Sequence, residues 1–265
     1  MTTTQVKPLV IKIGGAILEH ESALQALLKV IAELKGHPVV LVHGGGCVVD
    51  DMLAQANFTT EKKAGLRVTP SEQMPIISGA LAGTVNKSIV ATANSLGLTA
   101  VGLSLADGGM VNCKLSDKDL GLVGEPSAGD SKLLDTLIKT NFLPVISSIG
   151  ALAGGELVNV NADDAAVIIC QLLNAELLLL TDVNGVKGAD GEYLPTLDAK
   201  QANQLIEQGV IAGGMTAKVN AALAAAQQLR RSIAVASWKT PEQILTLVST
   251  NSENSQASGT RIQPY

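Results

Sequence analysis

The sequence predicts an α/β protein: a layered αβα sandwich, in two lobes, with helices on both faces of a largely parallel central sheet. Short runs of β-branched and aliphatic residues alternate with amphipathic stretches, which is the pattern of successive strand–helix–strand units. Of the 265 residues, 46% are hydrophobic but only 2% are aromatic, so aliphatic side chains must fill the core. Such a core is typical of helices packed on a parallel sheet.

The first 150 residues contain four predicted strands, at residues 9–13, 39–42, 100–103 and 143–147, where β-branched and aliphatic residues follow one another. Helices are predicted between and after them, at residues 22–34, 47–56, 75–96 and 132–140. The first of these places Leu24, Leu27, Leu28 and Ile31 on one face. The segment 107–130 is rich in Gly, Asp, Ser and Lys, which predicts a hairpin or loop.

The same alternation continues to the C-terminus. Helices are predicted at residues 165–173, 199–208 and 216–229, and strands at 177–180 and 233–236. A boundary near residues 175–190 divides the chain into lobes 1–175 and 176–265. The polar segment 250–258 is expected to be a mobile surface loop.

Composition excludes several classes of function. The formal net charge of −5 is unsuited to nonspecific nucleic-acid binding, which needs a basic surface. No unbroken apolar run reaches the roughly 18 residues of a membrane span, and the N-terminus lacks the apolar region of a signal peptide. We therefore expect a cytoplasmic protein that binds neither nucleic acid nor membrane.

Cysteines and histidines give no metal pattern. The three cysteines, Cys47, Cys113 and Cys170, are too widely spaced for a disulfide framework or a metal knuckle, which fits a reducing compartment. The three histidines do not cluster, so no metal site is expected. His43, at the end of a predicted strand, is expected to pack or hydrogen-bond rather than catalyse.

Two glycine-rich turns, each directly after an apolar strand, are the strongest functional signal. Gly14-Gly15 follows Lys12, and Gly44-Gly45-Gly46 follows His43. Glycines there leave backbone N–H groups unobstructed, and a following helix points its positive end at the same place, so a phosphate site is predicted. Each turn alone could use glycine for steric reasons. Neither turn has the spacing of a Walker A loop or a dinucleotide-binding turn, and the protein-kinase motifs are absent.

Five motifs stand in order along the chain: Lys12-x-Gly14-Gly15, Val42-His43-Gly44-Gly45-Gly46, Gly65-Leu66-Arg67-Val68-Thr69, Asn159-Val160-Asn161-Ala162-Asp163 and Gly213-Gly214-Met215-x-x-Lys218. In these motifs the sequence resembles the amino-acid-kinase family, from about residue 7 to the C-terminus. Residues 104–135 and 249–258 match only loosely. In their detailed residues these motifs are similar to those of family members that transfer a phosphoryl group from ATP to the γ-carboxylate of N-acetyl-L-glutamate.

The resemblance implies roles for the charged residues. Transfer to a carboxylate brings two anions together, so the site must neutralise charge and align the reacting groups. By resemblance Lys12 and Lys218 supply the positive charge, Lys12 nearer the acceptor and Lys218 nearer the nucleotide, and Asp163 orients both. The acceptor site in lobe 1–175 would comprise Gly14, Gly15, Gly44, Gly45, Gly46, Arg67, Asn159 and Asn161. Arg67 suits a carboxylate because guanidinium donates two parallel hydrogen bonds.

The resemblance places ATP in lobe 176–265. The nucleotide site would comprise Thr181, Asp182, Val183, Asn184, Gly185, Val186, Lys187, Val210, Ile211, Ala212 and Gly214, with Mg²⁺ held mainly by phosphates and water. The first predicted strand begins at residue 9, whereas the arginine-inhibited members of the family carry an extra N-terminal helix. An arginine-insensitive homodimer is therefore expected.

Simpler interpretations remain open for single residues. Lys12 alone could be a solvated strand residue, and Arg67, after Lys62-Lys63, could belong to a surface charge cluster. Asn159, Asn161 and Asp163 are common in turns and at helix N-caps. For the whole chain, the alternatives are a related kinase acting on glutamate, aspartate, carbamate or a nucleoside monophosphate, and an inactive amino-acid-sensing domain.

Overall fold

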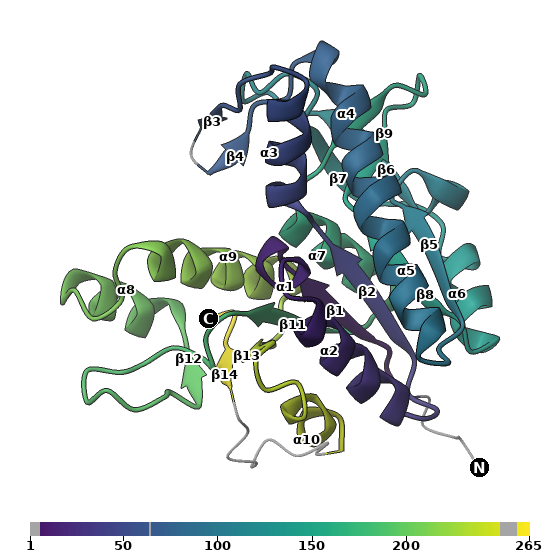
Figure 1. The fold of residues 1–265 in the computed structure, drawn as a ribbon. Helices are drawn as coiled ribbons and strands as arrows, with labels where there is room; N and C mark the ends of the chain where they lie inside the picture. The colour runs from purple at the N-terminus through teal and green to yellow at the C-terminus, as the bar shows by residue number, and fades with distance from the viewer. Residues whose placement is uncertain (1–5, 64, 250–258) are drawn as a thin grey trace.

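A computed structural model describes residues 6–63, 65–249 and 259–265, and its core is one eight-stranded sheet (Figure 1). Every neighbouring pair of strands is parallel except β13 and β14. The layered α/β prediction is thus confirmed. The strand order is β12 (Thr196–Leu197), β14 (Thr260–Ile262), β13 (Ile233–Ser237), β11 (Glu176–Thr181), β1 (Leu9–Ile13), β2 (Val39–His43), β8 (Leu143–Ser147) and β5 (Ala100–Ser104).

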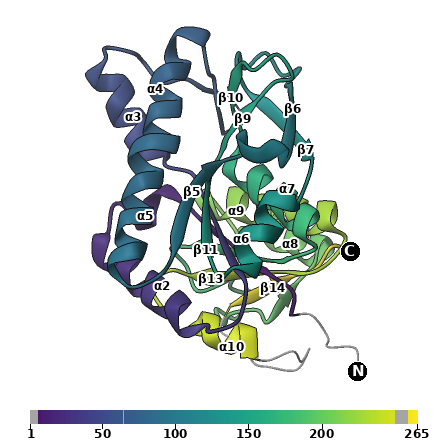
Figure 2. The ribbon, with the colours of Figure 1, turned by 90° about the vertical axis from the view of Figure 1, so that its right-hand side faces the viewer.

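Helices cover both faces of this sheet (Figure 2). One face packs against α6 (Lys132–Lys139), α7 (Ala162–Leu173), α8 (Ala199–Glu207) and α9 (Gly214–Leu229). The other packs against α1 (Gly15–Leu18), α2 (Glu21–Glu33), α5 (Asn86–Ser95) and α10 (Gln243–Ser249). The predicted helices are confirmed to within a few residues, whereas α1 and α10 were not predicted.

The pleat of β1 decides where Lys12 points. Ile11 and Ile13 belong to the core on the α2 side, and Val10 belongs to the core on the α7 side. Because successive side chains of a strand leave on opposite faces, Lys12 leaves on the α7 side. It does so one residue before the carboxyl end of the strand, next to the first glycine turn.

A third, smaller core lies beyond the carboxyl end of the sheet. It joins α3 (Gly46–Gln55) to a long helical segment through Val49, Leu53, Met74 and Ile77. That segment runs from a 3₁₀ turn, η1 (Ser71–Gln73), through α4 (Met74–Ser78) and a π-helical stretch, η2 (Gly79–Val85), into α5. Three hairpins accompany it: β3 (Lys62–Lys63) with β4 (Leu66–Arg67), β6 (Val111–Leu115) with β7 (Gly124–Ala128), and β9 (Ile149–Ala151) with β10 (Leu157–Asn159).

The long helical segment Ser71–Ser95 meets the length and composition of a membrane span, with a mean hydropathy of 1.2 in its most apolar window. Its buried residues Ile77, Leu81, Val85 and Ile89 pack into the second and third cores. A core helix of a folded protein can have the same length and composition, and because these residues pack into the protein's own cores we describe the segment as a core helix.

The hairpin or loop expected at 107–130 is the hairpin β6–β7. The loop expected at 250–258 lies outside the described residues. Strand β11, which begins at Glu176, pairs with β1 over five residue pairs. The sheet therefore crosses the expected boundary between lobes 1–175 and 176–265, and the division into two lobes stays a prediction.

Candidate active site

The two glycine turns lie side by side at the carboxyl edge of the sheet. β1 and β2 are neighbours, and the amide of Gly44 donates to the carbonyl of Ile13 at 3.4 Å. A Cβ built on Gly15 would lie 3.7 Å from the backbone nitrogen of Gly46, and one built on Gly44 would lie 3.3 Å from the Cβ of Ala162. The first turns of α1, α3 and α7 therefore converge on one place. The N–H groups at the starts of α1 and α3 favour an anion there, whereas two first-turn amides of α7 are already bonded to the side chain of Asn161.

Gly45 cannot be replaced without moving the helix above it. Its φ is +157°, and an added Cβ would lie 2.9 Å from Cγ2 of Val85 and 3.1 Å from Cδ2 of Leu81. Both residues belong to η2. Glycine is therefore favoured at position 45 by its positive φ and by the close approach of the π-helical stretch.

Lys12 forms an ion pair with Asp163, with 2.8 Å between Nζ and Oδ1. The Lys12 side chain is 17% exposed and that of Asp163 is 31% exposed. Asn161 is the N-cap of α7: its Oδ1 accepts hydrogen bonds from the amides of Asp163 at 2.8 Å and Asp164 at 3.3 Å. The N-cap interpretation is thus right for Asn161, and Asp163, in the first turn, is directed at Lys12.

Lys218 pairs with a different carboxylate from the one expected. It lies on α9 and hydrogen-bonds to Asp182, directly after β11. The hydrogen bond from Lys218 lowers the pKa of Asp182 below its usual value. Among the described residues Asp163 is paired with Lys12 alone, because Lys218 reaches from α9 to the end of β11 instead. Since β1 and β11 are adjacent, the two ion pairs still lie at the carboxyl ends of neighbouring strands.

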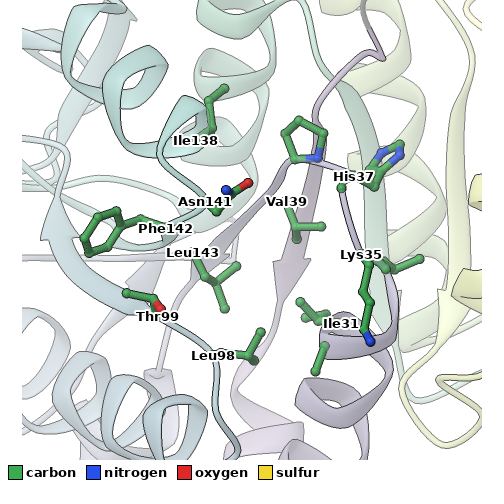
Figure 3. A pocket seen from close by; sticks show the side chains of 14 residues that line it. Ile31, Lys35, His37, Val39, Leu98, Thr99, Ile138, Asn141, Phe142 and Leu143 are labelled. Atoms are coloured by element: carbon green, nitrogen blue, oxygen red, sulfur yellow. The ribbon is translucent and has the colours of Figure 1, made fainter.

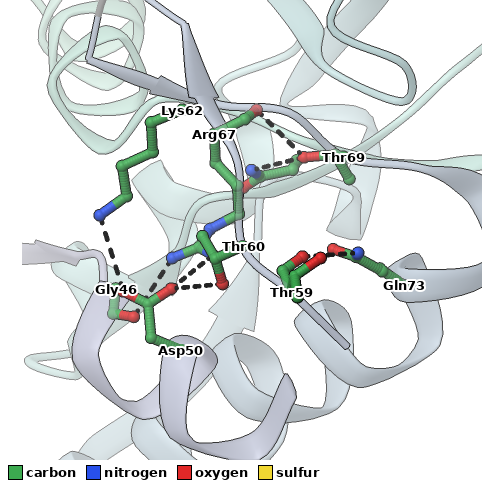
Figure 4. Close-up of polar contacts among 9 residues, drawn as sticks. Gly46, Asp50, Thr59, Thr60, Lys62, Arg67, Thr69 and Gln73 are labelled. Carbon is green, nitrogen blue, oxygen red and sulfur yellow. Dashed lines mark hydrogen bonds and ion pairs between the residues drawn. The ribbon is translucent and has the colours of Figure 1, made fainter. Parts of the chain in front are cut away.

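Arg67 is held in a network at the start of α3 (Figure 4). Its Nη1 lies 2.6 Å from Oδ1 of Asp50 and donates to Oγ1 of Thr60 at 3.2 Å, while Nη2 donates to the carbonyl of Gly46 at 3.2 Å. The side chain is only 9% exposed, so Arg67 is not a solvated surface charge. Asn159 reaches the same region by donating to Oγ1 of Thr69 at 3.2 Å.

Sequence reasoning missed Asp50. The residue lies one helical turn after Gly46 on α3, and this spacing is the only signal in the sequence that could have placed it near the glycine turn. Burial alone would raise the pKa of Asp50, but hydrogen bonds from Arg67 and Thr60 lower it below its usual value. Lys62 adds a longer contact to the same carboxylate, at 3.6 Å.

His43 is buried, with no exposed surface, and hydrogen-bonds through both ring nitrogens, as expected for a packing residue. Asn86 Nδ2 lies 3.0 Å from Nε2 and can only donate, so Nδ1 carries the proton and donates to the carbonyl of Gly44 at 2.8 Å. Burial lowers the pKa of His43 to about 4. The imidazole is therefore neutral at pH 7.

A small, mainly apolar pocket lies beside Lys218, between β11 and α9. It is lined by four of the residues expected at the nucleotide, Thr181, Val183, Gly185 and Val186, together with Met215 and others that the sequence did not single out. Gly185 is held against Thr260, whose Oγ1 would lie 2.6 Å from an added Cβ and accepts from the amide of Val186 at 2.8 Å. Thr260 is on β14, so only the folded chain brings it here.

The other residues expected at the nucleotide are not among those that line this pocket. Gly214 begins α9, Ala212 accepts from the amide of Met215 at 3.2 Å, Ile211 is buried and Val210 is exposed. Lys187 lies over the ring of Tyr193, 5.3 Å from its centroid, and Asn184 is half-buried in the turn before Gly185. Within the described part of the chain, no group of three or more His, Cys, Asp or Glu side chains could hold a metal ion.

A separate pocket lies at the opposite, amino-terminal edge of the sheet (Figure 3). It is lined by residues that include Lys35, His37, Asn141 and Phe142, near the C-terminal ends of α2 and α6. None of the five sequence motifs contributes to it. The motif residues gather instead at the carboxyl edge, where parallel sheets form their sites.

The chain is similar to known proteins in both sequence and fold. The model of the amino acid kinase family matches residues 7–237. The chain is 74% identical to the acetylglutamate kinase of Colwellia psychrerythraea over 264 residues, a coverage of 100% for each chain. It is 49% identical to that of Moritella profunda over 99% of this chain and 98% of the relative. A solved structure of N-acetylglutamate synthase from Neisseria gonorrhoeae, complexed with coenzyme A and N-acetyl-glutamate, superposes with a TM-score of 0.78 and 25% identity, over 97% of this chain and 59% of that one. This chain belongs to the amino acid kinase family.

Proposed function

We propose that this protein transfers the γ-phosphoryl group of ATP to the γ-carboxylate of N-acetyl-L-glutamate, forming N-acetyl-L-glutamyl 5-phosphate and ADP in arginine biosynthesis. The names of its close relatives support this acceptor. The structural observation that carries the proposal is the pair of ion-paired lysines, Lys12 and Lys218, at the ends of adjacent strands.

The chemistry needs little beyond charge and alignment. Two unit charges 4 Å apart interact by about 4 kcal/mol at an effective dielectric near 20, so two ammonium groups offset much of the repulsion between the reacting anions. Lys12 acts near the acceptor and Lys218 near the nucleotide. The carboxylate acceptor is already ionised at pH 7, so no general base is required, which is consistent with a buried, neutral His43.

The acceptor lies at the glycine turns. Backbone N–H groups of Gly14, Gly15, Gly45 and Gly46 donate to its γ-carboxylate and to the transferring phosphoryl oxygens, where the helix N-termini converge. Gly44, whose amide bonds to Ile13, allows the acceptor to approach the turn closely. Arg67 binds its α-carboxylate. Asn159, supported through Asn161 and the start of α7, binds the same end of the substrate.

The nucleotide lies in the pocket between β11 and α9, with its phosphates directed towards Lys218 and Asp182. The apolar lining from Val183, Val186 and Met215 suits a purine base. Bound Mg²⁺ would be held mainly by phosphate oxygens and water, and it would neutralise charge on the phosphates. In this proposal residues 1–175 serve the acceptor and residues 176–265 serve ATP.

The protein is further proposed to be a cytoplasmic homodimer. Cys47, Cys113 and Cys170 are all free thiols, as in a reducing compartment. Strand β5 ends the sheet and all of its residues are partly exposed, although side chains already bond the amides of Ala100 and Ser104 and the carbonyl of Gly102, so a second copy would contact this edge through side chains. Sedimentation velocity at micromolar concentration should give a dimer of the 27.2 kDa chain. A monomer or a hexamer would overturn this assignment.

A coupled ADP-release assay tests the activity. N-Acetylglutamate, glutamate, aspartate and carbamate are compared side by side, with the Lys12→Met variant as the inactive control. We expect turnover with N-acetylglutamate to exceed that with each other acceptor by at least about 100-fold, as expected of a site built to bind the acceptor's polar groups. Preference for another acceptor would make the chain a related kinase, and absence of turnover with all four would favour a sensing domain.

A further inference from the structure

The guanidinium of Arg67 has five N–H donors, and most of them are already engaged within the protein. Both donors of Nη1 are used, by Asp50 and Thr60, and one donor of Nη2 is used by the carbonyl of Gly46. For the remaining two donors, on Nη2 and Nε, the structure records no partner among the described residues. One pair of donors is therefore left for a ligand.

The anchors of Arg67 come from outside its own strand. The hairpin β3–β4 that carries it has only two residue pairs, and both strands are exposed or half-exposed. Such a short hairpin is not stable alone. Asp50, on α3, contacts Arg67, Thr60 and Lys62, so its carboxylate ties these three residues to the helix that begins at the glycine turn (Figure 4).

We infer that Asp50 is a positioning residue that makes the site selective for acceptors carrying a second carboxylate. Its carboxylate and the hydroxyl of Thr60 hold one side of the Arg67 guanidinium, so that the two unused donors face the acceptor as a preset fork. The inference rests on the proposed function, because it assumes that this site binds N-acetylglutamate. Arg67 touches the substrate, and Asp50 acts only through Arg67.

Two variants and one control test this role. Asp50→Asn keeps the size of the side chain but removes the charge, and Thr60→Val removes the bridging hydroxyl. Asp51→Asn is the matched control, because Asp51 is the neighbouring carboxylate on α3 and is exposed. For Asp50→Asn we expect KM for N-acetylglutamate to rise about 10- to 30-fold, since a hydrogen bond to a charged group is lost, with kcat and KM for ATP within about threefold of wild type. Thr60→Val should raise the same KM about threefold, as for a neutral hydrogen bond.

A second acceptor separates positioning from a general structural role. 4-Acetamidobutanoate keeps the acceptor carboxylate and the acetamide but lacks the α-carboxylate. We expect it to be a poor substrate, and its kcat/KM should change less than about threefold in Asp50→Asn. The substitution acts through Arg67, and this acceptor has no α-carboxylate for Arg67 to bind. An equal loss with both acceptors would overturn the inference.

The direction of the change also decides. If Asp50 competed with the substrate for Arg67, Asp50→Asn would lower KM for N-acetylglutamate, and this result or an unchanged KM would overturn the inference. If Asp50→Asn fails to fold, as a large fall in Tm would show, Thr60→Val becomes the test. An unchanged KM for N-acetylglutamate in Thr60→Val would then refute the inference. Inactivity of the wild-type protein on N-acetylglutamate refutes the proposed function itself and the inference with it.

Discussion

Replacing Lys218 with alanine should separate catalysis from stability. The Lys218 side chain is 41% exposed and that of its partner Asp182 is 45% exposed. A salt bridge that open to water contributes at most about 1 kcal/mol to folding, which is about 2–4 °C in Tm for a chain of this size. The loss of one charged donor at the transition state costs about 2.7–4 kcal/mol, so we expect kcat to fall about 10²- to 10³-fold.

The assay is initial-rate ADP release with saturating ATP and varied N-acetylglutamate, together with a thermal melt of the same sample. KM for the acceptor should stay within about threefold of wild type, because Lys218 acts on the transferring group and not on the bound acceptor. Lys200→Ala is the control, since Lys200 is an exposed lysine on α8. A Lys218→Ala enzyme that keeps turnover within a few-fold of wild type would refute the assigned role. A fall in Tm of about 10 °C or more would also refute it, because the loss of such an exposed ion pair cannot account for so large a fall.

Four further results are expected. Burial lowers the pKa of His43 from 6.5 to about 4, so between these pH values the unfolded chain binds a proton that the folded chain does not. The free energy of unfolding should therefore be highest above pH 6.5 and fall by about 3 kcal/mol as the pH is lowered to 4. Urea melts at several pH values should show this fall, and it should be smaller in His43→Gln. Gly45→Ala should destabilise by about 1–3 kcal/mol and reduce kcat, because its Cβ meets Val85. Gly79→Ala, at φ −61° with nothing nearby, should be neutral or slightly stabilising by up to about 1 kcal/mol in the same melts. Iodoacetamide should spare Cys170 in the native protein and label it after denaturation, as mass spectrometry can show, because burial raises the pKa of this thiol.

The sequence was sufficient for elements whose own residues decide them. Strands β1 and β2 were predicted because aliphatic residues follow one another in short runs, and helix α2 because its aliphatic residues recur with the helical period. The hairpin β3–β4 carries Lys62 and Lys63 and has no alternation to recognise. Strand β14 is three residues long and depends on pairing with β12 and β13, which are distant in the sequence.

The candidate site divides in the same way. Glycines and charged residues at strand ends could be identified one by one, because each belongs to a short local motif. The partners could not, since the pairing of Lys218 with Asp182 joins α9 to the end of β11, and the pairing of Arg67 with Asp50 joins a hairpin to α3. Which carboxylate a lysine reaches is decided by packing between elements, and no periodicity encodes it.

The sheet gives Lys12 and Arg67, the two cations that we propose contact the acceptor, unequal freedom. The strand that carries Lys12 is bound along all five residues by β2 on one side and by β11 on the other, so it cannot shift without breaking two ladders. Arg67, in contrast, lies on the hairpin β3–β4, which has only two residue pairs. Under the proposed function, we therefore expect acceptors of different length to be accommodated by movement of the β3–β4 hairpin, and exchange of residues 60–67 between relatives to alter acceptor choice without displacing Lys12.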